Sequence, residues 1–110
     1  MNFSIEVTSY FKGQSKRLIK KYPSLKKELS ELITLLKSDP KQGVSIGNNC
    51  YKVRIAIASK GKGKSGGARV ITNLQIINKK VFLISIYDKS EQNNISDKQL
   101  AEFLKFIVDE

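Results

Sequence analysis

The sequence of 110 residues contains no histidine, no tryptophan, one cysteine and two prolines. Its single cysteine, Cys50, excludes an internal disulfide and a cysteine-rich metal site, which suits a reducing compartment. No stretch of about 18 uninterrupted apolar residues occurs. The first residues, Met1 to Glu6, lack the charged-then-apolar layout of a signal peptide. We therefore expect a soluble, cytoplasmic protein with no membrane partner.

Acidic residues are also scarce, and the resulting positive charge is the main compositional feature. Twenty Lys and Arg residues against ten Asp and Glu give a formal charge of +10, enough to attract polyanions over long range. Basic residues dominate from Lys12 to Lys89, whereas the tail after Lys89 is mainly acidic. This distribution favours a nucleic-acid partner, but a lysine-rich solvated surface would explain part of it. The length fits one domain over residues 1–110.

The N-terminal part predicts one strand followed by two helices. Phe3, Ile5 and Val7 alternate with polar neighbours, as in a half-buried strand. Thr8 or Ser9 can then cap a helix that runs to about Lys21, before a proline interrupts the chain. A second helix ends before Pro40 and has apolar residues at helical spacing, namely Leu25, Leu29, Leu32, Ile33 and Leu36. The two helices should form an antiparallel hairpin.

The remaining chain predicts three strands and a final helix. Residues 41–49 are expected to form a connecting loop because they are rich in glycine and asparagine. A strand over residues 50–58 places Lys52 and Arg54 on one face and apolar side chains on the other. Strands over 68–77 and 80–87 follow, joined by a tight turn at residues 78–79. Ser96 and Gln99 match a capping box for the last helix, with Ile95 placed to contact Leu100.

These elements predict an α+β fold in the order β-α-α-β-β-β-α. We expect a small, curved, mostly antiparallel sheet with the two N-terminal helices packed on one face. With all helices on that face, the other face would be open to a ligand. Lys52 and Arg54 should point toward this open face.

The basic stretch, residues 59–69, carries the most specific local signal. Residues 58–65 fit a relaxed phosphate-loop pattern, but that motif needs a helix directly after it, and a strand follows here. Nucleotide hydrolysis is therefore disfavoured. The stretch is better interpreted as a flexible cationic loop whose glycines allow close approach to a phosphodiester, while Lys60, Lys62 and Lys64 bind RNA backbone. The alternative is a hairpin tip whose charges only prevent aggregation.

A ribonuclease must activate a 2′-hydroxyl, stabilise charge on the phosphate and protonate the leaving oxygen. This chain offers no histidine, and its acids between the second and last predicted helices form no ligand-spaced cluster. A nuclease here would be free of metal and cofactor and built from Lys, Arg and Tyr. A lysine base would need its pKa lowered from about 10.4 by about 3 units, a direction in which crowded cations push. Tyr87 could stack on a base or take part in proton transfer, or be structural.

Three segments resemble the RelE/ParE superfamily of toxins, particularly its HigB-like members. They are Tyr51-Lys-Val-Arg-Ile, the run from Ser59 to Ile71, and Leu83-Ile-Ser-Ile-Tyr-Asp-Lys-Ser-Glu91. The resemblance covers nearly the whole chain. It implies a RelE-like fold and a type II toxin-antitoxin toxin that cleaves mRNA in the ribosomal A site, with no metal or cofactor. It also implies a cognate antitoxin, of helix-turn-helix type, through which alone operator DNA is bound.

The resemblance further implies a set of site residues. The basic residues before the hairpin match Lys52 and Arg54, the arginine opening the next strand matches Arg69, and a C-terminal basic position falls near Lys89, with Tyr87 at the strand end. On this basis Arg54 and Arg69 stabilise the phosphate, Lys52 or Lys89 moves protons, and Tyr87 orients or stacks a base. Two alternatives remain open: a ParE-like inhibitor of DNA gyrase and a non-catalytic RNA-binding module.

Overall fold

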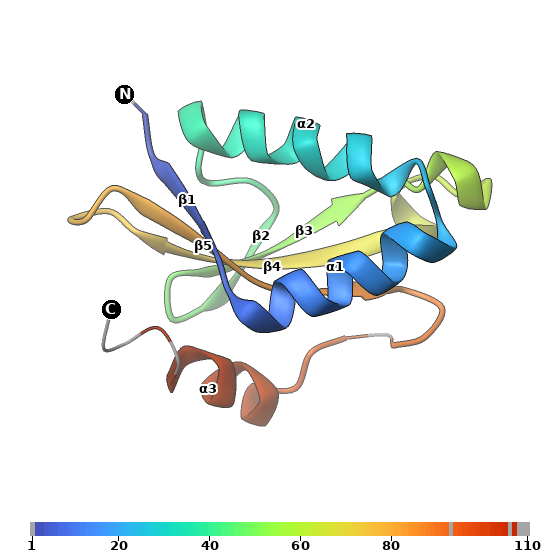
Figure 1. Ribbon diagram of the computed structural model, residues 1–110. Coiled ribbons are helices and arrows are strands. Elements are labelled where there is room, and N and C mark those ends of the chain that lie inside the picture. The colour runs from blue at the N-terminus through green and yellow to red at the C-terminus, as the bar shows by residue number, and fades with distance from the viewer. Residues whose placement is uncertain (1, 93, 106, 108–110) are drawn as a thin grey trace.

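The computed structural model describes residues 2–92, 94–105 and 107 as a five-stranded sheet with helices on both faces (Figure 1). The strand order is β1-β5-β4-β3-β2. The elements, in chain order, are β1 (Ser4–Val7), α1 (Ser9–Lys21), α2 (Leu25–Ser38), β2 (Val44–Gly47), β3 (Cys50–Ile55), the 3₁₀ turns η1 (Ala58–Lys60) and η2 (Lys64–Gly66), β4 (Ala68–Gln75), β5 (Lys80–Asp88) and α3 (Asp97–Lys105). None of the described helices has the length and apolar character needed to cross a membrane.

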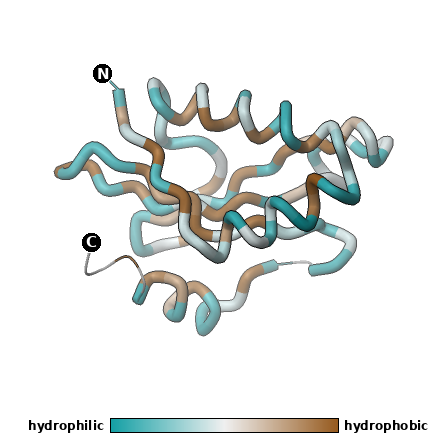
Figure 2. Tube along the Cα trace, viewed as in Figure 1, coloured by the Kyte–Doolittle hydropathy of each residue, from teal (hydrophilic) through white to brown (hydrophobic). Residues whose placement is uncertain are grey.

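Helices α1 and α2 form as the apolar spacing predicts. The Thr8 side chain caps α1 by accepting a hydrogen bond from the Phe11 N–H at 3.2 Å, which satisfies one of the free amides of the first turn. Both helices turn their apolar stripes toward the sheet and their polar sides outward (Figure 2). With residues from β3, β4 and β5 they form the first core, whose buried helical members are Phe11, Leu18, Leu25, Leu29, Leu32 and Leu36.

The predicted loop over residues 41–49 is wrong, because it contains strand β2. β2 pairs antiparallel with β3, and Gly47 lies opposite Cys50. Only Asn48 and Asn49 connect the strands, and both have positive φ, 55° and 59°. Two such residues in succession match the twist of a two-residue hairpin. The Asn-Asn pair was thus a hairpin signal that the glycines around it obscured.

Two other strand boundaries differ from the predictions. β3 ends at Ile55 rather than residue 58, where the chain turns into η1. β4 ends at Gln75, and a four-residue turn over residues 76–79 replaces the expected two-residue turn. β1 pairs parallel with β5 and the other three strand pairs are antiparallel, so the sheet is mixed and mostly antiparallel, as predicted. The α+β class and the packing of α1 and α2 on one face are confirmed.

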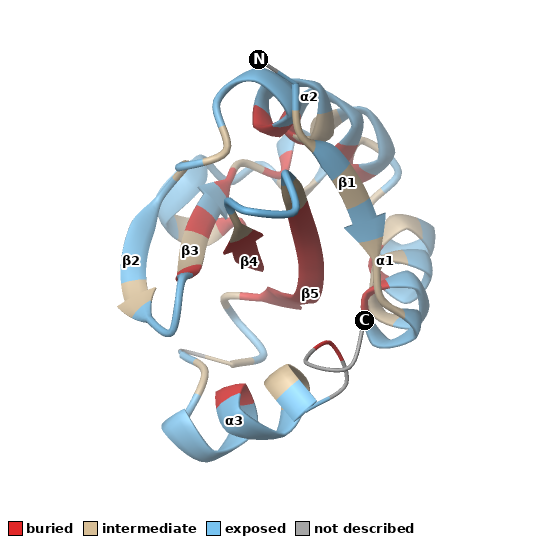
Figure 3. Ribbon diagram, turned by 90° about the vertical axis from the view of Figure 1, so that its left-hand side faces the viewer, coloured by how far each residue is buried: buried red, intermediate tan, exposed pale blue. Residues whose placement is uncertain are grey.

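Helix α3 lies on the face opposite α1 and α2, so the expectation of a fully open face is wrong (Figure 1). Its predicted capping box forms: the Gln99 N–H donates to Ser96 Oγ, and the Ser96 N–H donates to Gln99 Oε1, each at 3.1 Å. The apolar stripe of α3 covers part of this face to make the second core, namely Cys50, Ile71, Phe82, Ile84, Tyr87, Leu100 and Ile107. β4 and β5, enclosed on both sides, are the most buried strands (Figure 3).

Candidate nucleic-acid interface

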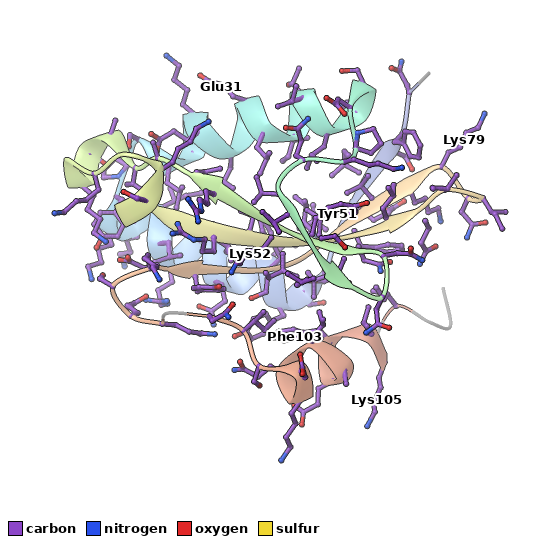
Figure 4. All side chains as sticks on the ribbon, turned by 180° about the vertical axis from the view of Figure 1, so that it is seen from behind. Glu31, Tyr51, Lys52, Lys79, Phe103 and Lys105 are labelled. Carbon is purple, nitrogen blue, oxygen red and sulfur yellow. The ribbon has the colours of Figure 1, made fainter. Side chains whose placement is uncertain are left out.

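Three of the predicted site residues form a row across the sheet. Arg54 on β3 lies opposite Arg69 on β4, and Arg69 lies opposite Tyr87 on β5. Directly opposed residues share a face, with Cβ atoms about 5 Å apart. Lys52 lies two residues before Arg54 on this same α3 side, whereas Tyr51 lies toward α2 (Figure 4). The structure therefore brings together residues that are up to 35 positions apart in sequence.

An irregularity in β5 decides which face Tyr87 occupies. Ile71 lies opposite Ser85 and Thr72 opposite Leu83, so Ile84 is an extra residue with no partner of its own in the ladder. Such a β-bulge shifts the alternation of side chains by one. Phe82 and Ile84 belong to the second core, and after the shift so does Tyr87. If the same sequence formed a regular strand without the bulge, Tyr87 would face α1 and α2.

Arg69, in the middle of this row, is held by backbone carbonyl groups. Its side chain is 4% exposed. Nη1 donates to the carbonyls of Lys64 at 2.9 Å and Ala68 at 3.2 Å, and Nη2 donates to the carbonyl of Ser65 at 3.0 Å. No carboxylate lies among these partners. The guanidinium thus keeps its full positive charge while its orientation is set by the turn η2.

Tyr87 is buried in the second core, and its hydroxyl has no hydrogen-bond partner among the described residues. Burial raises the pKa of the Tyr87 phenol above its ordinary value, and the positive charge of Arg69 opposes this only in part. The hydroxyl is therefore protonated at neutral pH, which suits a hydrogen-bond donor better than a base. A buried hydroxyl without a partner costs free energy unless a ligand supplies one.

The other basic residues of the predicted site are more accessible. Arg54 is exposed and Lys52 is partly buried, with its Nζ 3.3 Å from Asn94 Oδ1. Lys89 follows β5 and is partly buried, and its backbone N–H donates to the carbonyl of Gly67 at 3.0 Å. Asn94 was not predicted, because nothing local in the sequence indicates that the segment after β5 returns to β3.

The β3–β4 connection, residues 56–67, contains most of the basic stretch and is folded into the turns η1 and η2. A Cβ atom on Gly67 would lie 2.1 Å from the carbonyl oxygen of Ile55, so this close approach requires glycine. Of the three lysines predicted to bind RNA backbone, Lys62 and Lys64 are exposed. Lys60 differs: its side chain is 14% exposed and its ammonium pairs with Asp88.

Asp88 is the second residue that sequence reasoning missed. It is fully buried and accepts hydrogen bonds from Lys60 Nζ, from Tyr22 Oη at 2.8 Å, and from the N–H and hydroxyl of Ser90 at 3.0 and 2.8 Å. Burial by itself raises the pKa of this carboxyl, but the hydrogen bonds from Lys60, Ser90 and Tyr22 outweigh it, so its pKa lies well below the ordinary range. No local pattern in the sequence indicates these partners of Asp88.

The candidate surface, formed by Lys52, Arg54 and Arg69, brings three positive charges close together. Neither ion pair recorded among the described residues, Arg17–Glu91 or Lys60–Asp88, involves Lys52, Arg54 or Arg69. Like charges directly opposite on a sheet, as in Arg54 and Arg69, are unfavourable without a compensating anion. Two surface hollows lie elsewhere. One, of about 580 Å³, is lined mainly by the end of β4 and by the β2–β3 and β4–β5 turns, and the other, of about 670 Å³, mainly by residues 6–10. The arrangement fits an extended anion lying across the sheet end.

Comparisons with known proteins identify the family and the fold. The family model described as the RelE toxin of the RelE/RelB toxin-antitoxin system matches residues 10–108. The fold is similar to an E. coli RelE variant with two arginines replaced, in the free state, with a TM-score of 0.61 at 15% identity over 98% of this chain and 100% of that one. Isolated E. coli RelE gives 0.55 at 18% identity over 96% and 99%. RelE in the E. coli RelBE toxin-antitoxin complex gives 0.51 at 18% over 78% and 95%.

Proposed function

The chain belongs to the RelE toxin family of toxin-antitoxin systems, and from this membership we propose that it is an mRNA endonuclease that acts on the translating ribosome. The observation that carries the proposal is the row of Arg54, Arg69 and Tyr87 across three strands. Family membership alone would leave the activity open, because one fold can serve several functions. The row supplies two guanidinium groups that can stabilise a phosphate, and Lys52 lies on the same face of the sheet.

Each residue has a role in this mechanism. Arg54 and Arg69 stabilise the charge that develops on the scissile phosphate, since guanidinium groups match phosphate geometry. Lys52 or Lys89 moves the protons, and the protonated Tyr87 hydroxyl orients the substrate or its ring stacks on a base once the site is occupied. Lys62 and Lys64, exposed on the β3–β4 connection, bind the flanking RNA backbone. The mechanism routes no step through a metal ion or cofactor.

The proposed dependence on the ribosome has a physical basis. Arg69 and Tyr87 are buried. Neither of the two surface hollows described above includes the row of Arg54, Arg69 and Tyr87, so neither would orient free RNA against it. Holding the substrate in a reactive geometry can supply several kcal/mol of a reaction barrier. The ribosomal A site would hold the mRNA in this way, in the cytoplasm, so translation stops when the message is cut.

An antitoxin would neutralise the chain under this proposal. One of the similar structures is the E. coli RelBE toxin-antitoxin complex, which contains such a partner. We propose that the cognate antitoxin is of helix-turn-helix type and that operator DNA is bound only through the toxin-antitoxin complex. A small helix-turn-helix protein encoded in the adjacent reading frame would support this, and purification of the two chains as a stable complex would test it.

The test of activity is a purified translation reaction with mapped mRNA 5′ ends, run beside a DNA supercoiling assay. We expect cuts within codons of translated messages, none in the same RNA without ribosomes, and unaffected supercoiling. Inhibited supercoiling with intact mRNA would instead indicate a gyrase inhibitor. RNA binding without cuts would indicate a non-catalytic module. For variants that lose one positive charge, Lys27→Ala on the exposed side of α2 is the matched control.

A further inference from the structure

Lys60 lies where the β3–β4 connection meets the end of β5. It belongs to η1, and its ammonium pairs with Asp88 at the end of β5. The same ammonium donates to the carbonyl of Gly66 in η2 at 3.2 Å and to the hydroxyl of Ser90 at 3.1 Å. It also lies 5.6 Å from the centre of the Tyr22 ring. One cation therefore links both turns of the β3–β4 connection to the sheet and to α1.

The first turn is itself fastened to α2. The N–H of Ala58 donates to Glu28 Oε2, and the N–H of Ser59 donates to Ser24 Oγ, each at 2.9 Å. η1 is thus a fixed base, and Lys60 extends from this base to η2. By contrast, no side chain of η2 itself is buried. η2 is held by the hydrogen bond from Lys60 to the Gly66 carbonyl, by those from Arg69, and by the close approach of the adjoining Gly67 to β3.

η2 in turn sets the orientation of Arg69. The carbonyls of Lys64 and Ser65, both in this turn, accept hydrogen bonds from Nη1 and Nη2. A shift of η2 would carry these carbonyls away and let the guanidinium rotate about its long side chain. Misplacement of a catalytic group by about 1 Å can lower a rate about 100-fold.

We propose that Lys60 and Asp88 are positioning residues of the cleavage site, whose buried ion pair fixes η2 so that its carbonyls aim the guanidinium of Arg69 at the scissile phosphate. The inference rests on the proposed nuclease function. It gives Lys60 a role different from RNA binding, because a lysine that is already paired and 14% exposed offers little charge to a phosphate.

The experiment measures single-turnover mRNA cleavage on programmed ribosomes as a function of toxin concentration, together with the thermal unfolding midpoint. The variants are Lys60→Met, Lys60→Arg, Asp88→Asn and the double variant Lys60→Met with Asp88→Asn, with Lys27→Met as the charge control. For Lys60→Met and Asp88→Asn we expect the saturating rate to fall about 10- to 100-fold. The half-saturating concentration should change less than about threefold, because binding is unaffected. Lys60→Arg should recover part of the rate.

The double variant separates positioning from general stability. Removing one partner of a buried pair leaves an uncompensated charge, whereas removing both relieves that penalty. We expect the unfolding midpoint of the double variant to return toward that of the wild type while the cleavage rate stays low. Recovery of the rate together with the midpoint would overturn the proposal. So would a Lys60→Met variant in which only the half-saturating concentration rises, since that result would make Lys60 an RNA ligand.

A second measurement does not depend on cleavage. The Nε–H resonance of Arg69 in ¹⁵N spectra should shift in Lys60→Met and Asp88→Asn and stay in place in Lys27→Met. An unchanged resonance in a folded Lys60→Met protein would overturn the positioning role, even if Asp88→Asn fails to fold. If the wild type cuts no mRNA, the nuclease proposal fails, and this resonance then decides by itself whether the pair orients Arg69.

Discussion

Tyr87 lies directly opposite Arg69 across the β4–β5 ladder, on the face that α3 partly covers. The two residues meet because Ile84 is an extra residue in β5 and shifts the alternation of the strand. A buried phenol without a hydrogen-bond partner thus sits beside a guanidinium that has no carboxylate partner. Such an arrangement stabilises the fold little, which favours a role in binding or chemistry.

Replacing the exposed arginine should separate activity from stability. Arg54→Ala removes one of two opposed cations without exposing a buried group, so the free energy of unfolding should stay within about 0.5 kcal/mol of the wild type. The cleavage rate should fall by about 100-fold or more, because a phosphate ligand is lost. Urea unfolding and the ribosome assay measure the two effects, with Lys27→Ala as control. Undiminished toxicity of Arg54→Ala would contradict the assigned role.

Tyr87→Phe should move stability and activity in opposite directions. The Tyr87 hydroxyl is buried without a partner, so its removal should leave the unfolding free energy unchanged or raise it by about 1 kcal/mol. If the hydroxyl orients the substrate, cleavage should fall about tenfold or more, because a hydrogen bond to a charged group contributes about 1.5 to 3 kcal/mol. A variant that is both destabilised and fully active would show that the hydroxyl has a structural partner instead.

Asp88 should make the protein sensitive to acid. Its folded pKa is lower than its unfolded value, so the unfolded chain takes up the proton first as the pH falls. The stabilisation is complete well above the unfolded pKa, which is near 4, and is lost progressively as the pH decreases from about 5 toward the folded pKa. Thermal midpoints between pH 3 and 7 should therefore fall more steeply for the wild type than for Asp88→Asn. Ser90→Ala, which removes one donor to Asp88, should give an intermediate slope.

Two glycines of the same connection should respond differently to alanine. A Cβ on Gly67 would meet the backbone of Ile55 and Ala56 at 2.1 and 3.1 Å, and backbone cannot move aside easily. We expect Gly67→Ala to destabilise the fold by about 1 to 3 kcal/mol. Nothing lies within 4 Å of a Cβ on Gly63, so Gly63→Ala is the matched control and should keep the wild-type midpoint. Equal midpoints for the two variants would mean that η2 is not held against β3.

Lys62 and Lys64 should contribute to RNA affinity through charge alone. Binding to a single strand weakens with salt at a slope of about −0.7 per phosphate contact. Lys62→Ala and Lys64→Ala should each reduce the slope of log K against log salt by about 0.7, measured with an uncleavable 2′-O-methyl RNA. Lys27→Ala should leave the slope unchanged. Identical slopes for all three variants would exclude these two lysines from the RNA-binding surface.

Local patterns were sufficient for most of the secondary structure. The cap at Thr8, the capping box at Ser96 and Gln99, and the leucine spacing of α2 depend on residues within one or two turns, which the sequence displays directly. β2 was missed because a strand of four residues that ends in glycine is too short to show a clear alternation of apolar and polar side chains. Tyr87 was a candidate from its own chemistry, and the family resemblance then assigned roles to Tyr87 and Arg69.

The sequence by itself determined the helices, the main strands, the cationic character and the shared face of Lys52 and Arg54, because each depends on neighbours in the chain. Only the tertiary structure decided that α3 covers the second face, that the bulge at Ile84 turns Tyr87 toward Arg69, and that Lys60 pairs with Asp88. These outcomes depend on strand register and on contacts between residues far apart in sequence. The physical reason is that strand register and long-range pairing are set by the packing of the whole sheet, which cannot be inferred from any short segment of the sequence.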